Sequence, residues 1–114
     1  MPSIYKIVPA DLWREAEASG VFHGSPVDLA DGFIHFSTAA QVEETAAKHF
    51  AGQQNLLLVR VDADALGPAL KWEPSRGGAL FPHFYGALTL NSVHSTEPLP
   101  LGENGLHRFP PLAV

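Results

Sequence analysis

The sequence contains no cysteine, and this absence excludes several kinds of chemistry at once. Without thiols the chain forms no disulfides, zinc ribbons, iron–sulfur clusters or thiolate nucleophiles. Six histidines are present, so any acid–base or metal chemistry has to use His, Asp, Glu, Tyr and Ser. The histidines show no HxxxH or HExxH spacing, and GxGxxG, P-loop and GxSxG motifs are absent. None of these common motifs therefore identifies a function.

Positive charge is also scarce. Seven Lys and Arg stand against twelve Asp and Glu, which gives a net charge of -5 with His neutral. The basic residues are spread from Lys6 to Arg108 without forming a cluster, and this argues against nucleic acid as a partner. A small phosphorylated ligand stays compatible with the composition, because one Arg and a few backbone N–H groups suffice to bind it.

Long hydrophobic runs are missing as well. The apolar run Leu56–Val59 is far too short to cross a bilayer, and the first residues lack the features of a signal peptide. We therefore expect a cytoplasmic protein with no membrane partner. A chain of 114 residues with 46% hydrophobic positions predicts a single domain over residues 1–114. Its Pro- and Gly-rich tail, from about residue 98, is expected to wrap the surface.

Hydrophobic patterning predicts an α+β fold, with two early helices followed by a mostly antiparallel β half. One helix is expected between Pro9 and Gly20. The other is expected over residues 38–50, because Thr38 and Gln41 fit a capping box. Residues 21–30 read as turns, and residues 62–68 as a short helical turn. Strands are expected over residues 4–8, 33–36, 56–61, 70–73, 80–86, 88–90 and 93–97, with 56–61 buried on both faces.

The first candidate site lies in the short apolar strand that contains His35. A buried imidazole needs hydrogen-bond partners, and Ser37 shares its face of the strand. The two side chains can therefore bind one polar ligand, while the expected helix start at Thr38 offers free N–H groups to an anion. The alternative is a buried histidine with satisfied hydrogen bonds beside an ordinary helix cap.

The second candidate is the aromatic segment Leu80–Gly86. His83 and Tyr85 share a face of the expected strand and can donate to and accept from a sugar hydroxyl, while the aromatic rings can stack on a planar group. Glycines on both sides, at positions 77, 78 and 86, allow close backbone approach. The alternative is an aromatic core strand with polar tips.

The third candidate runs from Trp72 to Gly78. Glu73, beside Trp72, has a raised pKa if it is desolvated, which suits a general acid or base. Arg76 lies in a Gly-rich loop and can clamp a phosphate or a carboxylate. The alternative is a Glu73–Arg76 ion pair that holds the loop and contributes little if exposed.

Taken together, the segments DGFIHFST (31–38), Trp72-Glu73 and LFPHFYG (80–86) resemble an uncharacterised bacterial family, catalogued as domain of unknown function 952. The resemblance extends from Ile4 to about Pro98. By fold, this family is usually grouped with the ADP-ribosyltransferase-like proteins. The resemblance thus implies two small, strongly bent antiparallel sheets around a cleft.

The resemblance also implies roles for individual residues. In enzymes of that superfamily a strand His or Arg contacts the nicotinamide ribose of NAD, a second strand supplies a residue that packs the nicotinamide, and a Glu often polarises the acceptor or the ribose. His35 resembles the ribose-contacting position. Glu73 departs from the pattern, because it precedes His83 instead of ending the series. The matching residue types here are His35, Ser37, Thr38, Glu73, His83 and Tyr85.

From these observations we expect a protein that binds a nucleotide-like or other small polar ligand in a His-lined cleft, with NAD-dependent ADP-ribosyl transfer as the most concrete version. Glu73 and His83 are the predicted catalytic residues, and no metal ligand is predicted. The predicted ligand contacts are His35, Ser37, Thr38, Arg76 and Tyr85. Two alternatives remain open: a metal-dependent hydrolase or isomerase that uses the two histidines and Glu73, and a non-catalytic interaction module. The sequence leaves the ligand, the acceptor and the oligomeric state open.

Overall fold

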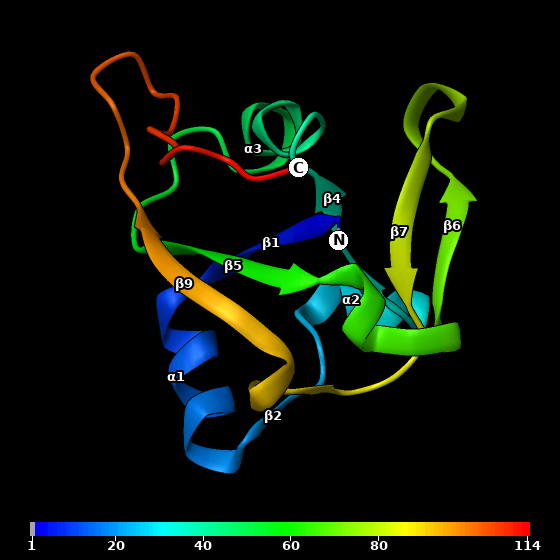
Figure 1. The fold of residues 1–114 in the computed structure, drawn as a ribbon. Helices are drawn as coiled ribbons and strands as arrows, with labels where there is room; N and C mark the ends of the chain where they lie inside the picture. Colours follow the sequence, from blue (N-terminus) through cyan, green and yellow to red (C-terminus); the bar gives the residue numbers. More distant parts are fainter. Residues whose placement is uncertain (1) are drawn as a thin grey trace.

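The most apolar segment of the sequence forms an inner strand of a four-stranded antiparallel sheet (Figure 1). In this sheet β5 (Leu56–Asp62) lies between β1 (Ser3–Pro9) and β9 (Val93–Leu99), and β4 (Ser37–Thr38) pairs with the other edge of β1. Side chains of β5 enter the cores on both faces of the sheet. The expectation of a strand buried on both faces is therefore confirmed.

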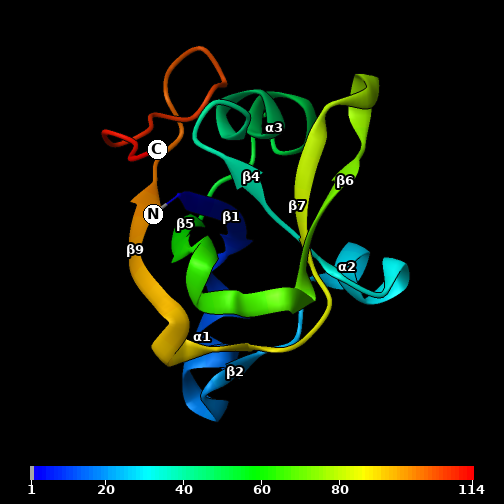
Figure 2. The ribbon, with the colours of Figure 1, turned by 45° about the vertical axis from the view of Figure 1, so that its right-hand side comes forward.

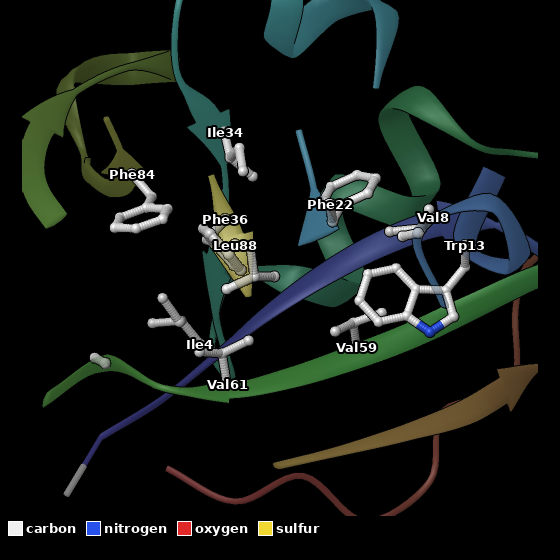
Figure 3. Close-up of a cluster of buried hydrophobic side chains, with 12 residues drawn as sticks. Ile4, Val8, Trp13, Phe22, Ile34, Phe36, Val59, Val61, Phe84 and Leu88 are labelled. Atoms are coloured by element: carbon white, nitrogen blue, oxygen red, sulfur yellow. The ribbon is translucent and has the colours of Figure 1, made fainter. Parts of the chain in front are cut away.

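The structure is a computed structural model that describes residues 2–114, with the side chain of Arg76 outside the described part. One face of the four-stranded sheet carries the larger hydrophobic core (Figure 3). Helix α1 (Ala10–Ser19) covers this face with Trp13 and ends at Gly20, whose φ of 85° is left-handed, as expected for a C-terminal glycine. Residues labelled in this core are Ile4, Val8, Trp13, Phe22, Ile34, Phe36, Val59, Val61, Phe84 and Leu88.

The opposite face of the sheet packs against α3 (Val42–His49) and the C-terminal tail. Phe109 and Leu112 lie on this second core cluster. The Tyr5 hydroxyl donates to the carbonyl of Ala113 over 2.9 Å and accepts from its N–H over 2.8 Å. The tail is thus fixed to the first strand of the sheet.

Two smaller antiparallel sheets complete the fold. In the three-stranded sheet β7 (Leu80–Phe84) lies between β3 (Ile34–His35) and β6 (Leu70–Pro74), and β2 (Val21–Phe22) pairs with β8 (Leu88–Thr89). Figures 1 and 2 show β6 and β7 projecting as a hairpin beside β4 and α3. The α+β class is confirmed, but the described residues form three sheets where two were expected.

Helix α2 (Pro26–Asp31) occupies a segment that was expected to contain only turns. Ser25 and Asp28 form a reciprocal capping box, and Pro26 stands at the first helical position, where its missing N–H costs nothing. These signals lie in the sequence, but the helix has only six residues and shows no clear period. The expectation was wrong because capping can nucleate a helix this short once it packs on the core.

Helix α3 begins at Val42, and not at Thr38 as expected. Thr38 pairs with Ile4 in β4, and its N–H donates to Gln41 Oε1 over 3.0 Å, so only half of the predicted capping box forms. Short 3₁₀ helices lie at Ala63–Ala69, Arg76–Gly78 and Leu90–Ser92. Among the described residues, no helix is long and apolar enough to cross a membrane.

Candidate functional site

The pairing of β3 with β7 brings the two histidines singled out in the sequence together. His35 lies directly opposite His83 in the register, and their rings meet edge to face with centroids 5.5 Å apart. Glu73 comes from β6, on the other side of β7, and its Oε1 accepts a hydrogen bond from His83 Nδ1 over 2.8 Å. The same oxygen accepts from the Tyr85 hydroxyl over 2.7 Å. Four of the predicted site residues therefore converge.

Phe33 lies at the centre of these side chains. Its ring stacks on His83 at a centroid distance of 4.2 Å, and it lies 4.5 Å from the ring of His35 and 5.1 Å from that of Tyr85. Phe33 was not among the residues predicted from the sequence, although its spacing of two from His35 places both on one face of an extended segment. We call Phe33, His35, Glu73, His83 and Tyr85 the two-histidine cluster.

Glu73 is the partly open carboxylate of the cluster, with a side chain 35% exposed. Hydrogen bonds donated by Tyr85 and then by His83 lower the pKa of Glu73 and outweigh its partial desolvation. A raised pKa was expected only for a desolvated Glu73, and this condition is not met; the pKa is lowered because the two donors favour the ionised form. Within the described part of the chain, the second oxygen Oε2 has no hydrogen-bond partner. The ionised Glu73 can therefore accept hydrogen bonds and stabilise a nearby positive charge.

His83 is buried and oriented by Glu73. An ionised carboxylate can only accept hydrogen bonds, so His83 Nδ1 carries the hydrogen. No described residue bonds to Nε2. Since Nδ1 holds the hydrogen of a neutral ring, Nε2 presents a lone pair, the arrangement in which a carboxylate-oriented histidine acts as a base. Tyr85 stays protonated, because donation to Glu73 raises the pKa of its hydroxyl.

His35 is held by a buried carboxylate from α2. Asp28 Oδ1 accepts from the His35 backbone N–H over 3.1 Å and from the ring Nδ1 over 2.6 Å. Asp28 also accepts from the backbone N–H and the hydroxyl of Ser25, each over 2.8 Å. The ammonium of Lys6 lies 3.0 Å from Asp28 Oδ2 and donates to the His35 carbonyl over 3.0 Å. Ring and backbone of His35 are thus both fixed.

Burial and pairing act in opposite directions on the Lys6–Asp28 pair inside the protein. Burial opposes ionisation of Asp28, but the His35 hydrogen bond, the Lys6 charge and the backbone N–H groups outweigh it and hold the pKa of Asp28 well below its usual range. Burial lowers the pKa of Lys6, and Asp28 counteracts this effect. The sequence contained a sign of the pair, since Lys6 is the one charged residue within the apolar strand Ile4–Val8.

A second carboxylate reaches the other nitrogen of His35. Asp31 Oδ2 lies 2.9 Å from His35 Nε2. The side chain of Asp31 is 47% exposed, whereas that of Asp28 is fully buried. Asp31 was not singled out in the sequence, because its contact depends on the turn that follows α2.

A cleft of about 480 Å³ opens on the other side of His35. Segments of β1, α2, α3 and the β3–β4 strands enclose it, and most of its lining side chains are apolar, among them Ile7, Val42 and Phe50. The cleft is lined by Tyr5, Lys6, Ile7, Pro9, Ser25, Pro26, Val27, His35, Phe36, Ser37, Val42, Thr45, His49 and Phe50. Glu73, His83 and Tyr85 are absent from this lining, so His35 borders both the cleft and the rest of the cluster.

Two predicted ligand contacts, Ser37 and Thr38, do not join the two-histidine cluster. Ser37 is buried and its hydroxyl bonds to that of Thr45 over 2.9 Å, although it also lines the cleft. The N–H of Thr38, which was expected to be free for an anion, donates to Gln41 Oε1. The prediction for Arg76 falls on a side chain outside the described residues.

The described residues offer no group of three or more His, Cys, Asp or Glu side chains that could hold a metal ion. Nδ1 of both His35 and His83 faces a carboxylate instead. The metal-dependent alternative therefore has no ligand set in the part of the chain that the structure describes.

The fold and the cluster define a class: a small α+β protein in which two paired strands of a minor antiparallel sheet present facing histidines. The family described as "Protein of unknown function (DUF952)" matches residues 7–96. The chain belongs to this family, which confirms the resemblance seen in its sequence.

Solved structures of a relative share the fold. The crystal structure of protein CC0527 from Caulobacter crescentus is 52% identical over 93% of both chains, with a TM-score of 0.90. The solution NMR structure of CC0527 is 53% identical, covers 93% of this chain and 91% of that chain, and has a TM-score of 0.85. No curated protein matches the chain. These comparisons establish family and fold and assign no ligand or reaction.

Proposed function

We propose that this protein has an ADP-ribosyltransferase-like fold, binds NAD as substrate at the two-histidine cluster and transfers its ADP-ribose group. The observation that carries the proposal is the convergence of His35 from β3, Glu73 from β6, His83 from β7 and Tyr85 directly after β7, with Phe33 packed against both histidines and Tyr85. These residue types match those that the family resemblance implies. Fold likeness alone does not assign a reaction, so the proposal rests on the chemistry of the cluster.

Glu73 suits the bond-breaking step. When the bond between ribose C1 and the nicotinamide nitrogen breaks, its electron pair leaves with nicotinamide and positive charge develops on the ribose. No side chain that the structure describes bonds to Oε2 of the ionised Glu73, and a fixed carboxylate beside developing positive charge stabilises the transition state. Its lowered pKa makes it a poor proton donor at neutral pH. Electrostatic stabilisation is therefore its role.

His83 suits the bond-forming step. The acceptor, water or a nucleophilic group of another molecule, forms a bond to C1 through a lone pair and releases a proton. Nε2 of His83 is free of partners in the described part of the chain, and its lone pair can take that proton. Glu73 orients the ring and stabilises the imidazolium that forms.

The surroundings of the cluster suit a nucleotide. Tyr85 is 40% exposed and its hydroxyl is fixed on Glu73, so a planar group meets an aromatic ring of set orientation. The neighbouring cleft of about 480 Å³ falls within the volumes typical of small-molecule sites. Because His35 borders both regions, a ligand that extends from the cluster into the cleft passes this residue.

The proposal is tested by measuring nicotinamide released from NAD. We expect release by the wild-type protein and a loss of roughly 100-fold or more in Glu73→Gln, the size of effect typical of a lost electrostatic contact at a transition state. Glu17→Gln, on the exposed side of α1, is the matched control and should retain full activity. NAD binding without nicotinamide release, with a range of acceptors, would instead indicate a binding module.

A further inference from the structure

His35 is held by two carboxylates that differ in how firmly they are fixed. Asp28 is fully buried and accepts hydrogen bonds from Lys6, Ser25 and His35. Asp31 is 47% exposed, and among the described residues its carboxylate contacts only His35 Nε2. Asp28 is therefore part of the framework, whereas Asp31 can move away from His35 into solvent at little cost.

The negative charge of Asp31 does not stabilise α2, the helix to which this residue belongs. Asp31 is the last residue of α2, and no basic residue lies in that last turn. The carboxyl end of a helix is the negative end of its dipole, where an acidic side chain is unfavourable. The helix is already terminated by Gly32, with a left-handed φ of 87°. The stability of α2 therefore gives no reason for an acidic residue at this position.

The hydrogen-bonding groups of His35 and Asp31 show what kind of group can come between the two side chains. Nδ1 faces Asp28 Oδ1 over 2.6 Å, and Nε2 lies 2.9 Å from Asp31 Oδ2, which is an ion pair in the protonated form of the ring, where both nitrogens carry hydrogen. A ligand hydroxyl can accept from Nε2–H and donate to the Asp31 carboxylate, so both remain satisfied. A phosphate oxygen can only accept and faces the Asp31 charge. The position selects a neutral hydroxyl over an anion.

We propose that Asp31 is a ligand-binding residue, which together with His35 Nε2 recognises a vicinal diol of a nucleotide sugar. One hydroxyl accepts from Nε2–H, and its neighbour donates to the Asp31 carboxylate. Asp31 keeps His35 paired until the diol arrives and then becomes its hydrogen-bond acceptor. This inference rests on the proposed function in one respect, namely that the ligand carries a ribose.

The probe for this inference is ADP-ribose, compared with ADP-ribose whose vicinal diols have been cleaved by periodate and reduced to alcohols. By calorimetry, we expect the wild-type protein to prefer the intact probe by at least about 10-fold. Asp31→Ala should bind intact ADP-ribose roughly 10- to 100-fold more weakly, as expected for a lost hydrogen bond to a charged group. Its preference for the intact diol should disappear. The affinity of Asp31→Asn for intact ADP-ribose should lie between those of the wild-type protein and Asp31→Ala, because this variant keeps the shape of the side chain and loses its charge.

The matched control is Asp64→Asn, at an exposed position of the Ala63–Ala69 helix, which should bind both probes like wild type. An unchanged preference in Asp31→Ala, or no binding of ADP-ribose by the wild-type protein, overturns the inference. The two proposals fail separately. Diol-selective binding without nicotinamide release from NAD contradicts only the transferase. Release with an unchanged diol preference in Asp31→Ala contradicts only the role of Asp31.

Discussion

Lys6 and Asp28 form the buried ion pair behind His35. Both are buried, and the ammonium and carboxylate lie 3.0 Å apart. Removal of one partner leaves the other charge buried without its counter-ion, and such changes typically cost several kcal/mol. The pair also fixes the backbone of His35, through the Lys6 bond to its carbonyl. Framework stability and site geometry therefore depend on the same two residues.

The first prediction concerns Lys6→Met. We expect the free energy of unfolding in urea to fall by about 3–5 kcal/mol, because Asp28 loses its buried counter-charge. The matched control is Lys48→Met, since Lys48 pairs with Glu44 on the exposed side of α3 over 3.2 Å. That change should cost about 0.5 kcal/mol or less. Equal losses in the two variants would show that the buried pair does not stabilise the fold.

The second prediction concerns acid stability. The pKa of Asp28 is lower in the folded protein than in the unfolded chain, where an aspartate titrates near about 3.9. As the pH falls toward and below that value, the unfolded chain binds the proton first. The stability that Asp28 contributes is therefore complete at neutral pH and lost with acid. The double variant Lys6→Met/Asp28→Asn should show a flatter pH dependence of unfolding between about pH 6 and pH 2 than wild type. A slope as steep as wild type would contradict this.

Several individual residues of the two-histidine cluster could be predicted from the sequence. His35, Glu73, His83 and Tyr85 stand in short strand-like segments where alternation predicts the shared faces. Their meeting depends on β3 pairing with β7, which local patterns do not reveal. Asp28 and Asp31 reach His35 only through the turn after α2, and no periodic signal predicts such a contact.

Among the elements, α2 matters most for the site, because both of its ends reach His35. The segment before it makes a close turn at Gly24, whose φ is 126°. A Cβ at this position would lie 2.7 Å from the Cβ of Asp28, whereas a Cβ on Gly32 would meet no atom within 4 Å. The two positions therefore require glycine on different physical grounds. At Gly32 only the left-handed backbone demands it, but at Gly24 steric contact adds to the backbone strain.

The third prediction compares these two positions. Gly32→Ala should lower the free energy of unfolding by about 1–2 kcal/mol, the cost of a left-handed alanine. Gly24→Ala should cost more, because Asp28 has to move, and it should also shift the NMR signals of the His35 ring. Urea denaturation and histidine-selective spectra test both statements. Equal costs with unchanged His35 signals in both variants would show that Asp28 is not held by the turn.

The sequence predicted the longer elements better than the short ones. The strand at residues 56–62 and the helix that ends at Gly20 have strong periodic or capping signals, and both formed as expected. Helix α2 was missed because six residues are too few to show a helical period. The start of α3 was misplaced because Thr38 gains more from pairing with β1 than from capping a helix.

In the whole molecule, the two faces of the four-stranded sheet pack against different parts of the chain. One face, with α1 and the smaller sheets, supports the two-histidine cluster. The other, with α3 and the C-terminal tail, closes the second core. The relative CC0527 keeps this fold at 52% identity, with a TM-score of 0.90 for its crystal structure. The second core shares Tyr5, Val42 and Phe50 with the lining of the cleft. No described residue of the tail is part of that lining, so the tail should stabilise the protein without contacting a ligand there.

The fourth prediction follows from this division. Leu112→Ala removes a partly buried side chain from the second core and should lower the free energy of unfolding by about 1–2 kcal/mol, less than for a fully buried leucine. The affinity for ADP-ribose should stay at the wild-type value. Leu106→Ala, at an exposed position, should change neither quantity. A loss of ADP-ribose affinity in Leu112→Ala under conditions where the protein is folded would mean that the tail and the site are coupled.

The central claim is that the two-histidine cluster binds NAD, and calorimetric titration tests it most directly. We predict a saturable heat with one NAD per wild-type chain. In Tyr85→Ala, which removes a partly exposed ring outside the buried core, the affinity should fall at least about 10-fold, as for a lost stacking contact with a planar group. No heat from the wild-type protein at millimolar NAD, or an identical titration of the variant, would contradict the account.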